Sequence, residues 1–215
     1  MDQHQFSFPN VSSYMTNPAA LFSVGYGLYI VTTRENGKDS GLVVNTVSQV
    51  SNDPTVLAVG INRANFSAEV ISRTKKLNVN VLTESAPFSL FQRFGFQSGR
   101  TADKMKDLIY GRSENNLPVL REYTSAFFSL SVQKEIILPT HILFLCTIEE
   151  SEVFSKENAM TYAFYHASVK PKKKAENKKG YVCKICGYVH EAEMLPADFI
   201  CPICKHPASD FEKLS

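Results

Sequence analysis

Residues 26–50 read YGLYIVTTRENGKDSGLVVNTVSQV, and this stretch decides the fold of the larger part of the chain. Two runs rich in β-branched and aromatic residues, 26–33 and 41–50, flank Asn36-Gly37. An Asn-Gly pair between such runs is typical of a tight hairpin turn, because both residues tolerate positive φ. We therefore expect an antiparallel hairpin whose strands cover 26–33 and 41–50.

The same kind of pattern continues outward from this hairpin. Further strands are expected at 55–61, 77–82, 126–133 and 141–148, and Cys146 in the last of them is expected to be a buried core thiol. Helical signals are few: a helix capped by Asn65 and running to about residue 73, with weaker candidates at 87–93 and 101–109. Many strands, short helices and no alternating strand–helix rhythm favour a mainly β barrel. No Gly-x-Gly-x-x-Gly motif follows a strand, which excludes a Rossmann nicotinamide-binding domain.

Length and composition describe an ordinary globular chain. The 215 residues fit one medium domain and a small appendage, and 44% of them are hydrophobic. The first ten residues lack the features of a signal peptide, and no apolar run reaches the ~18 residues that cross a bilayer. We expect a cytoplasmic protein that does not bind membranes.

The stretch 169–180, VKPKKKAENKKG, carries six lysines and one glutamate. Such a run can be a nucleic-acid patch, but no aromatic residues are interleaved with it, so a solvated linker is the better interpretation. We expect no nucleic-acid partner. The linker separates a domain at 1–168 from a second one at 181–215.

Four cysteines near the C-terminal end form two CxxC pairs, Cys183-Lys-Ile-Cys186 and Cys201-Pro-Ile-Cys204. This spacing lets four thiolates hold one tetrahedral metal, either iron or zinc. A module of about 35 residues buries too little surface to fold alone, so its metal must also be structural. The small core around it is expected to contain Tyr181, Tyr188, Phe199 and Phe211.

The residues around these cysteines, YVCKICGY at 181–188 and CPIC at 201–204, resemble rubredoxin. The separation of the pairs is about half that of full-length rubredoxins and is similar to the short form at the end of rubrerythrins. The resemblance implies a single iron that carries one electron at a time. A zinc ribbon stays open as the alternative, and zinc can also enter an iron site on heterologous expression.

Three segments of the first domain resemble the flavin-reductase-like family. They are GLVVNTVSQVSNDP at 41–54, NRANFS at 62–67 and FGFQSGRTADK at 94–104, joined by Thr140-His141. The resemblance covers nearly all of 20–168 and implies an FMN-binding split β-barrel. Members of the family are usually homodimers with the flavin near the subunit interface.

The chemistry of FMN gives each of these segments an expected role. The ring edge can be bonded by small polar groups on a strand, here Asn45, Thr46 and Gln49. The phosphate favours a helix N-terminus with hydroxyl groups and cations nearby. The residues expected there are Asn62, Asn65, Ser67, Ser98, Arg100 and Lys104.

His141 is a catalytic candidate, because the family keeps a histidine there close to flavin and nicotinamide. Each of these assignments has a simpler alternative. The strand residues can face solvent, Asn65 can be only a helix cap, and His141 can be a core histidine. Arg100 and Lys104 can be ordinary surface charges.

The arrangement as a whole resembles high-molecular-weight rubredoxins, in which a flavin domain is fused to an iron module. The resemblance implies an NAD(P)H-dependent flavin/rubredoxin oxidoreductase. Electrons would pass from NAD(P)H through FMN to iron and on to a redox protein, for example a flavodiiron protein. The alternatives are a non-enzymatic electron carrier and a flavin-binding protein with a structural zinc ribbon.

Overall fold

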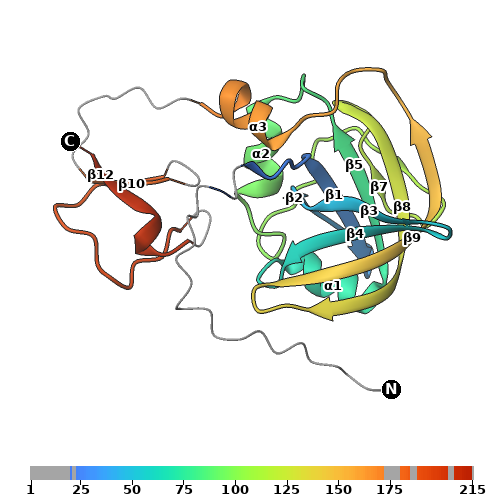
Figure 1. Cartoon of the computed structure of the whole chain (residues 1–215), viewed down its shortest axis with the longest axis horizontal. Helices are drawn as coiled ribbons and strands as arrows, with labels where there is room; N and C mark the ends of the chain where they lie inside the picture. The colour runs from blue at the N-terminus through green and yellow to red at the C-terminus, as the bar shows by residue number, and fades with distance from the viewer. Residues whose placement is uncertain (1–19, 21–22, 172–179, 185–187, 203–205, 215) are drawn as a thin grey trace. The chain divides into compact units, whose positions relative to one another are not determined.

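The structure is a computed structural model that describes residues 20, 23–171, 180–184, 188–202 and 206–214 (Figure 1). Contacts between Cα atoms divide the chain into two compact units, Met1–Val169 and Lys170–Ser215. Each unit is described by itself below.

The first unit is built on a seven-stranded antiparallel sheet with the order β2-β1-β5-β8-β9-β4-β3 (Figure 1). The outermost strands, β2 and β3, are joined in the chain by residues 45 and 46 alone, and the Gly60 N–H on β4 donates to the Thr46 carbonyl (2.9 Å). The two edges of the sheet are thereby brought together, as in a barrel. The mainly β prediction is confirmed. The strands are β1 Tyr29–Glu35, β2 Lys38–Val44, β3 Val47–Asn52, β4 Thr55–Asn62, β5 Lys76–Leu82, β8 Thr124–Ile137 and β9 His141–Val153.

The predicted hairpin is present between β1 and β2. Asn36 and Gly37 both adopt positive φ (50° and 79°), and Glu35 lies opposite Lys38. This is the turn geometry whose twist matches that of the flanking strands. The predicted strand 41–50 is wrong in one respect. The chain turns at residues 45–46 to pass from one edge of the sheet to the other, so β2 and β3 are separate strands.

Two α-helices of eight or more residues accompany the sheet among the described residues, α1 Phe66–Thr74 and α2 Phe88–Gly95. Asn65 is the N-cap residue of α1 and is extended (φ −76°, ψ 131°), but its side chain makes no capping hydrogen bond. The predicted helix at 101–109 is wrong. This segment forms turns, because Asp107 adopts φ 61° and Lys104 points into the interior. The short α3 Tyr162–Phe164 and η2 Tyr165–Val169 had no counterpart in the predicted elements.

Both faces of β1 are buried in hydrophobic clusters. Val31 belongs to a cluster that includes Ile71 of α1, and Ile30 belongs to a second cluster that includes Phe94 of α2. Cys146 is fully buried in the first cluster, which confirms the core assignment, and burial raises the pKa of its thiol to about 12.

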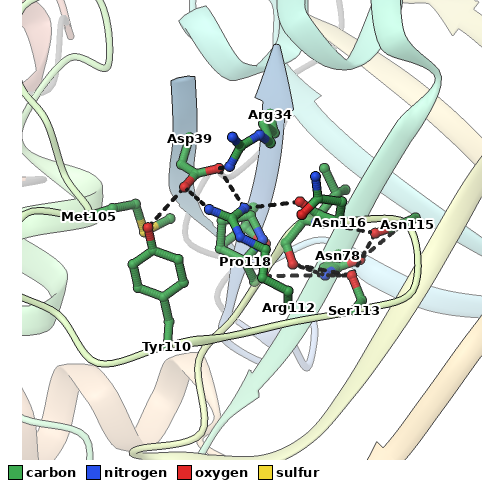
Figure 2. Close-up of polar contacts among 12 residues, drawn as sticks. Arg34, Asp39, Asn78, Met105, Tyr110, Arg112, Ser113, Asn115, Asn116 and Pro118 are labelled. Atoms are coloured by element: carbon green, nitrogen blue, oxygen red, sulfur yellow. Dashed lines mark hydrogen bonds and ion pairs between the residues drawn. The ribbon is translucent and has the colours of Figure 1, made fainter. Parts of the chain in front are cut away.

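The polar positions of β5 are also buried. Asn78 donates to the Ser113 hydroxyl (2.8 Å; Figure 2), and Asn80 donates to the Ile30 carbonyl (3.0 Å) and accepts from the Leu120 N–H (2.9 Å). These bonds hold the segment that carries the two-residue strands β6 Gly111–Arg112 and β7 Pro118–Val119 against the sheet. Within the described part of the chain, no helix has the length and apolar character that crossing a bilayer requires.

The second unit contains a three-stranded sheet of β10 Gly180–Cys183, β11 Val189–His190 and β12 Phe211–Leu214, with the 3-10 turn η3 Ala208–Asp210 before β12. Its core contains Cys183 and Cys201 at 0% exposure. The expected aromatic core is confirmed, since the same cluster includes Tyr181, Tyr188, Phe199 and Phe211.

Candidate functional sites

Predicted site residues from distant parts of the sequence meet at the N-terminal end of α1. Asn62, at the end of β4, lies opposite His141, at the start of β9. The chain then turns, with the Arg63 N–H donating to the Thr140 carbonyl (3.0 Å), and reaches Asn65 immediately before the helix. The side chains of Asn62, Asn65 and His141 are exposed here. The structure therefore brings these three residues to one accessible edge.

The turn at residues 98–100 packs against the same end of the helix. Arg100 forms an ion pair with Glu69, and its guanidinium lies 5.2 Å from the centre of the Phe66 ring. A Cβ on Gly99 would lie 2.6 Å from the Ser40 hydroxyl and 3.1 Å from the Phe66 ring, so only glycine allows this close approach. Ser98 and Arg100 are thus placed beside the first turn of α1, where backbone N–H groups attract anions.

The three strand residues expected to bond the flavin ring are split by the structure. Asn45 and Thr46 lie in the β2–β3 connection, where the Thr46 hydroxyl donates to the Asn45 side-chain oxygen (3.1 Å). Gln49 lies opposite Leu57, which is five residues from Asn62 along β4, or ~17 Å at the usual strand rise. Its amide donates to the Ser51 carbonyl (3.2 Å) and the Asn52 side chain (2.7 Å). Gln49 is therefore remote from the helix, as a ring contact at the far end of FMN would be.

Two of the residues expected at the phosphate lie in the interior instead. Ser67 is 3% exposed, and its hydroxyl shares a hydrogen bond with Ser40 (3.0 Å). Lys104 is 5% exposed, and its ammonium donates to the carbonyls of Gly41 and Phe94, both at 2.9 Å. Burial lowers the pKa of Lys104 to about 8. The Lys104 ammonium and the Ser67 hydroxyl thus bond other protein groups. Of these two residues, Ser67 can offer an anion its backbone N–H.

Lys38 was not singled out by the sequence. It lies just after the hairpin turn, and its ammonium is 5.8 Å from the centre of the Phe66 ring. Lys38 and Arg100 therefore contact the same ring at the start of α1. No sequence signal marks Lys38, because the hairpin approaches this helix only in the folded chain.

The hairpin also borders an open hollow of about 780 Å³ whose lining includes four cationic side chains, Arg34, Lys38, Lys106 and Arg112. Figure 2 shows that both arginines point toward Asp39. Arg34 bonds one Asp39 oxygen at 3.0 Å, and Arg112 bonds both oxygens. Asp39 pairs with both guanidiniums, so these side chains form a polar clamp between the hairpin and residues 110–112.

The first cysteine of each CxxC pair makes the same kind of backbone hydrogen bond in the second unit. The Cys183 N–H donates to the Tyr188 carbonyl and the Cys201 N–H donates to the His206 carbonyl, both at 2.8 Å. Each bond joins a cysteine N–H to the carbonyl five residues later, so Cys183 and Cys201 make the same backbone contact. Both described thiols are buried, as thiolate ligands of one metal would be. The other two expected ligands, Cys186 and Cys204, lie outside the described residues.

Comparison with known protein families identifies the family of each unit. Residues 21–172 match the model described as flavin reductase like domain. The chain belongs to the flavin-reductase-like family. Residues 181–212 match the model described as rubrerythrin, rubredoxin-like domain. This flavin-reductase-like protein therefore carries a C-terminal rubredoxin-like module, as the sequence motifs predict.

Individual relatives are similar to the whole chain or to its larger part. The chain is 33% identical to the high molecular weight rubredoxin of Moorella thermoacetica, over 91% of this chain and 98% of that protein. It is 31% identical to the ferric-chelate reductase (NAD(P)H) of Archaeoglobus fulgidus, over 71% of this chain and 90% of that protein. A flavin reductase domain protein from Arthrobacter has the same fold (TM-score 0.57, 19% identity), with 64% of this chain and 83% of that one covered. The flavin-reductase-like protein is thus an oxidoreductase whose two units have a flavin and an iron as their expected cofactors.

Proposed function

We propose that this protein takes electrons from NAD(P)H through FMN to a rubredoxin-type iron and delivers them to a redox protein, such as a flavodiiron protein. The observation that carries the proposal is the presence of a flavin-reductase-like unit and a rubredoxin-like unit in one chain. Bound flavin exchanges electron pairs with a hydride donor and single electrons with an iron tetrathiolate. The nicotinamide donor is supported by the relative from Archaeoglobus, a ferric-chelate reductase (NAD(P)H).

In this proposal the FMN phosphate binds at the N-terminal end of α1. The backbone N–H groups of the first turn supply donors, and Arg100 supplies a positive charge from the turn at 98–100. Asn62, Asn65 and Ser98 add short polar side chains around this edge. Asn45, Thr46 and Gln49 bond the ring edge along the β2–β3 connection and β3.

His141 is proposed to act where the nicotinamide meets the flavin. Its Nδ1 lies 2.8 Å from the Thr140 hydroxyl, and this bond fixes the orientation of the imidazole. The other ring nitrogen, Nε2, is then the atom available to bond a substrate. His141 and the phosphate-binding edge adjoin through the pairing with Asn62.

Cys183, Cys186, Cys201 and Cys204 are proposed to hold the iron. The burial of Cys183 and Cys201 and their matching backbone hydrogen bonds support this assignment. Linking the two units in one chain gives a local concentration in the millimolar range, so electron transfer does not depend on a diffusional encounter. The active form is proposed to be a homodimer.

The test is an anaerobic titration of the full-length, metal-loaded protein with NADH or NADPH, followed at the flavin and ferric tetrathiolate bands. Reduction of both chromophores is expected. If both bands persist after addition of NADH and of NADPH, the protein is an electron carrier that depends on another flavoprotein. A flavin spectrum without a ferric band, in protein from its native host, would favour a structural zinc ribbon.

A further inference from the structure

Lys104 of the first unit is a buried cation. Among the described residues its ammonium bonds two carbonyl groups and forms no ion pair with a carboxylate. Burying a cation is costly unless polar groups replace its water. Two backbone carbonyls do so here. Phe94 lies in the last turn of α2, where carbonyl groups lack helical partners and carry the negative end of the helix dipole. The ammonium therefore caps this helix.

The second carbonyl connects this cap to the sheet. Gly41 lies on β2, and a Cβ at this position would be 2.9 Å from the Phe94 ring, so α2 packs directly onto the strand here. Lys104 reaches back ten residues to Phe94, and Arg93 donates in return to the Lys104 carbonyl (3.5 Å). The two ends of segment 94–104 are thus fastened to each other and to β2.

The middle of this segment is the turn that carries Ser98 and Arg100. Gly99 packs on Ser40, the strand residue next to Gly41, and Ser40 also bonds Ser67 of α1. Strand β2, which bonds Lys104 through Gly41, therefore also contacts the turn at 98–100 and helix α1 through Ser40. Lys104 and the turn thus share neighbouring residues of β2 as their support.

We propose that Lys104 is a positioning residue for the flavin site, because its bonds to Gly41 and Phe94 fix the turn at 98–100 against the N-terminal end of α1. This inference rests on the proposed binding of the FMN phosphate at that end. Lys104 acts on the phosphate only through the turn and does not touch it.

The test compares Lys104→Met with Lys106→Met in the full-length protein. Lys106 is exposed two residues further on and is the matched loss of one positive charge. The dissociation constants of FMN and riboflavin are measured for each variant. Lys104→Met is expected to weaken FMN about tenfold, the scale of one charge-assisted bond, and to leave riboflavin unchanged. Lys106→Met is expected to leave both unchanged.

A role confined to stability would lower the unfolding midpoint of Lys104→Met but leave the ratio of FMN to riboflavin affinity as in the wild type, and that result would overturn the proposal. Combination with Arg100→Ala separates positioning from direct contact. If Lys104 acts through the turn, the two losses are less than additive, whereas fully additive losses contradict the proposal.

Gly99→Ala gives an independent test should Lys104→Met fail to fold. The new methyl collides with Ser40 and Phe66 and displaces the same turn. A selective loss of FMN affinity is expected, and an unchanged ratio would overturn the proposal. In the wild type, equal affinity for FMN and riboflavin would instead reject the proposed phosphate site itself.

Discussion

Arg112 bonds both carboxylate oxygens of Asp39, at 2.9 and 2.7 Å, and the Tyr110 hydroxyl donates to the same carboxylate at 2.9 Å (Figure 2). The Asp39 side chain is only 9% exposed, and paired, parallel bonds from a guanidinium are among the stronger polar contacts in proteins. The clamp ties the β1–β2 hairpin to a segment more than seventy residues further along the chain.

Replacing Asp39 by Asn should therefore destabilise the first unit by about 2 kcal/mol at pH 7, since the guanidiniums lose their countercharge. Burial alone would raise the pKa of Asp39, but the bonds from Arg112 and Tyr110 hold it below its ordinary value. The contribution is thus present at neutral pH and lost as pH falls through the lowered pKa. Urea unfolding should show wild type and variant converging as pH falls below the ordinary range of an aspartate carboxyl. Asp107→Asn is the control, because Asn tolerates the positive φ of that exposed position.

Arg100→Ala should weaken FMN binding about tenfold and leave riboflavin binding unchanged, because it removes a cation from the phosphate end only. Arg73→Ala is a close control. Arg73 lies in the last turn of the same helix and also forms an ion pair, with Glu35 at 2.7 Å. Its loss should change neither affinity. Fluorescence titration of both flavins measures the effect, and equal losses of FMN and riboflavin in Arg100→Ala would place this guanidinium away from the phosphate.

Local sequence patterns were enough for the barrel and for the metal-binding module. The Asn36-Gly37 turn and the strands around it are determined by residues that are neighbours in the sequence. The spacing of the cysteines in the CxxC pairs is enough to predict metal binding. The polar side chains whose burial the sequence did not predict depend on distant partners. Lys104 was expected at the FMN phosphate, but its ammonium bonds the Gly41 carbonyl, sixty-three residues away. Asn78 and Asn80 look like solvent-facing strand positions, yet they bond a segment that joins the sheet only in the folded chain.

The stability of the wild type relative to Lys104→Met should depend on alkaline pH. The pKa of Lys104 is lowered by burial from 10.5 to about 8, so the folded state releases its proton before the unfolded state does. Below pH 8 the ammonium is charged in both the folded and the unfolded state, and burying the charge lowers the free energy of unfolding. This cost disappears as pH rises to 10.5, because the folded state then holds Lys104 neutral. The wild type should gain roughly 3 kcal/mol relative to the methionine variant across this window. Urea unfolding of both proteins between pH 7 and 10.5 checks it, and a constant difference would contradict the shift.

Cys201→Ser should abolish the ferric absorption and unfold the second unit, because the core formed by its described residues, around Cys183, Cys201 and Phe211, is small. The first unit has separate hydrophobic clusters and should keep its flavin. Metal analysis, visible absorption and flavin stoichiometry measure the three effects. Cys146→Ser is the control, since Cys146 is a core thiol of the first unit and its loss should leave the iron in place. Flavin lost together with the iron in Cys201→Ser would mean that the two units do not fold independently.

A chain ending at Val169, where the first compact unit ends, should separate nicotinamide oxidation from electron delivery. If NAD(P)H reacts only at the flavin, this shortened protein should oxidise it with an artificial acceptor at close to the wild-type rate. It should lose reduction of a one-electron protein acceptor, because the four cysteines are gone. In the full-length protein, stopped-flow absorbance should show flavin reduction first and iron reduction second. An iron centre reduced by NAD(P)H equally fast when residues 170–215 are supplied as a separate chain would show that the linked flavin unit is not its electron source.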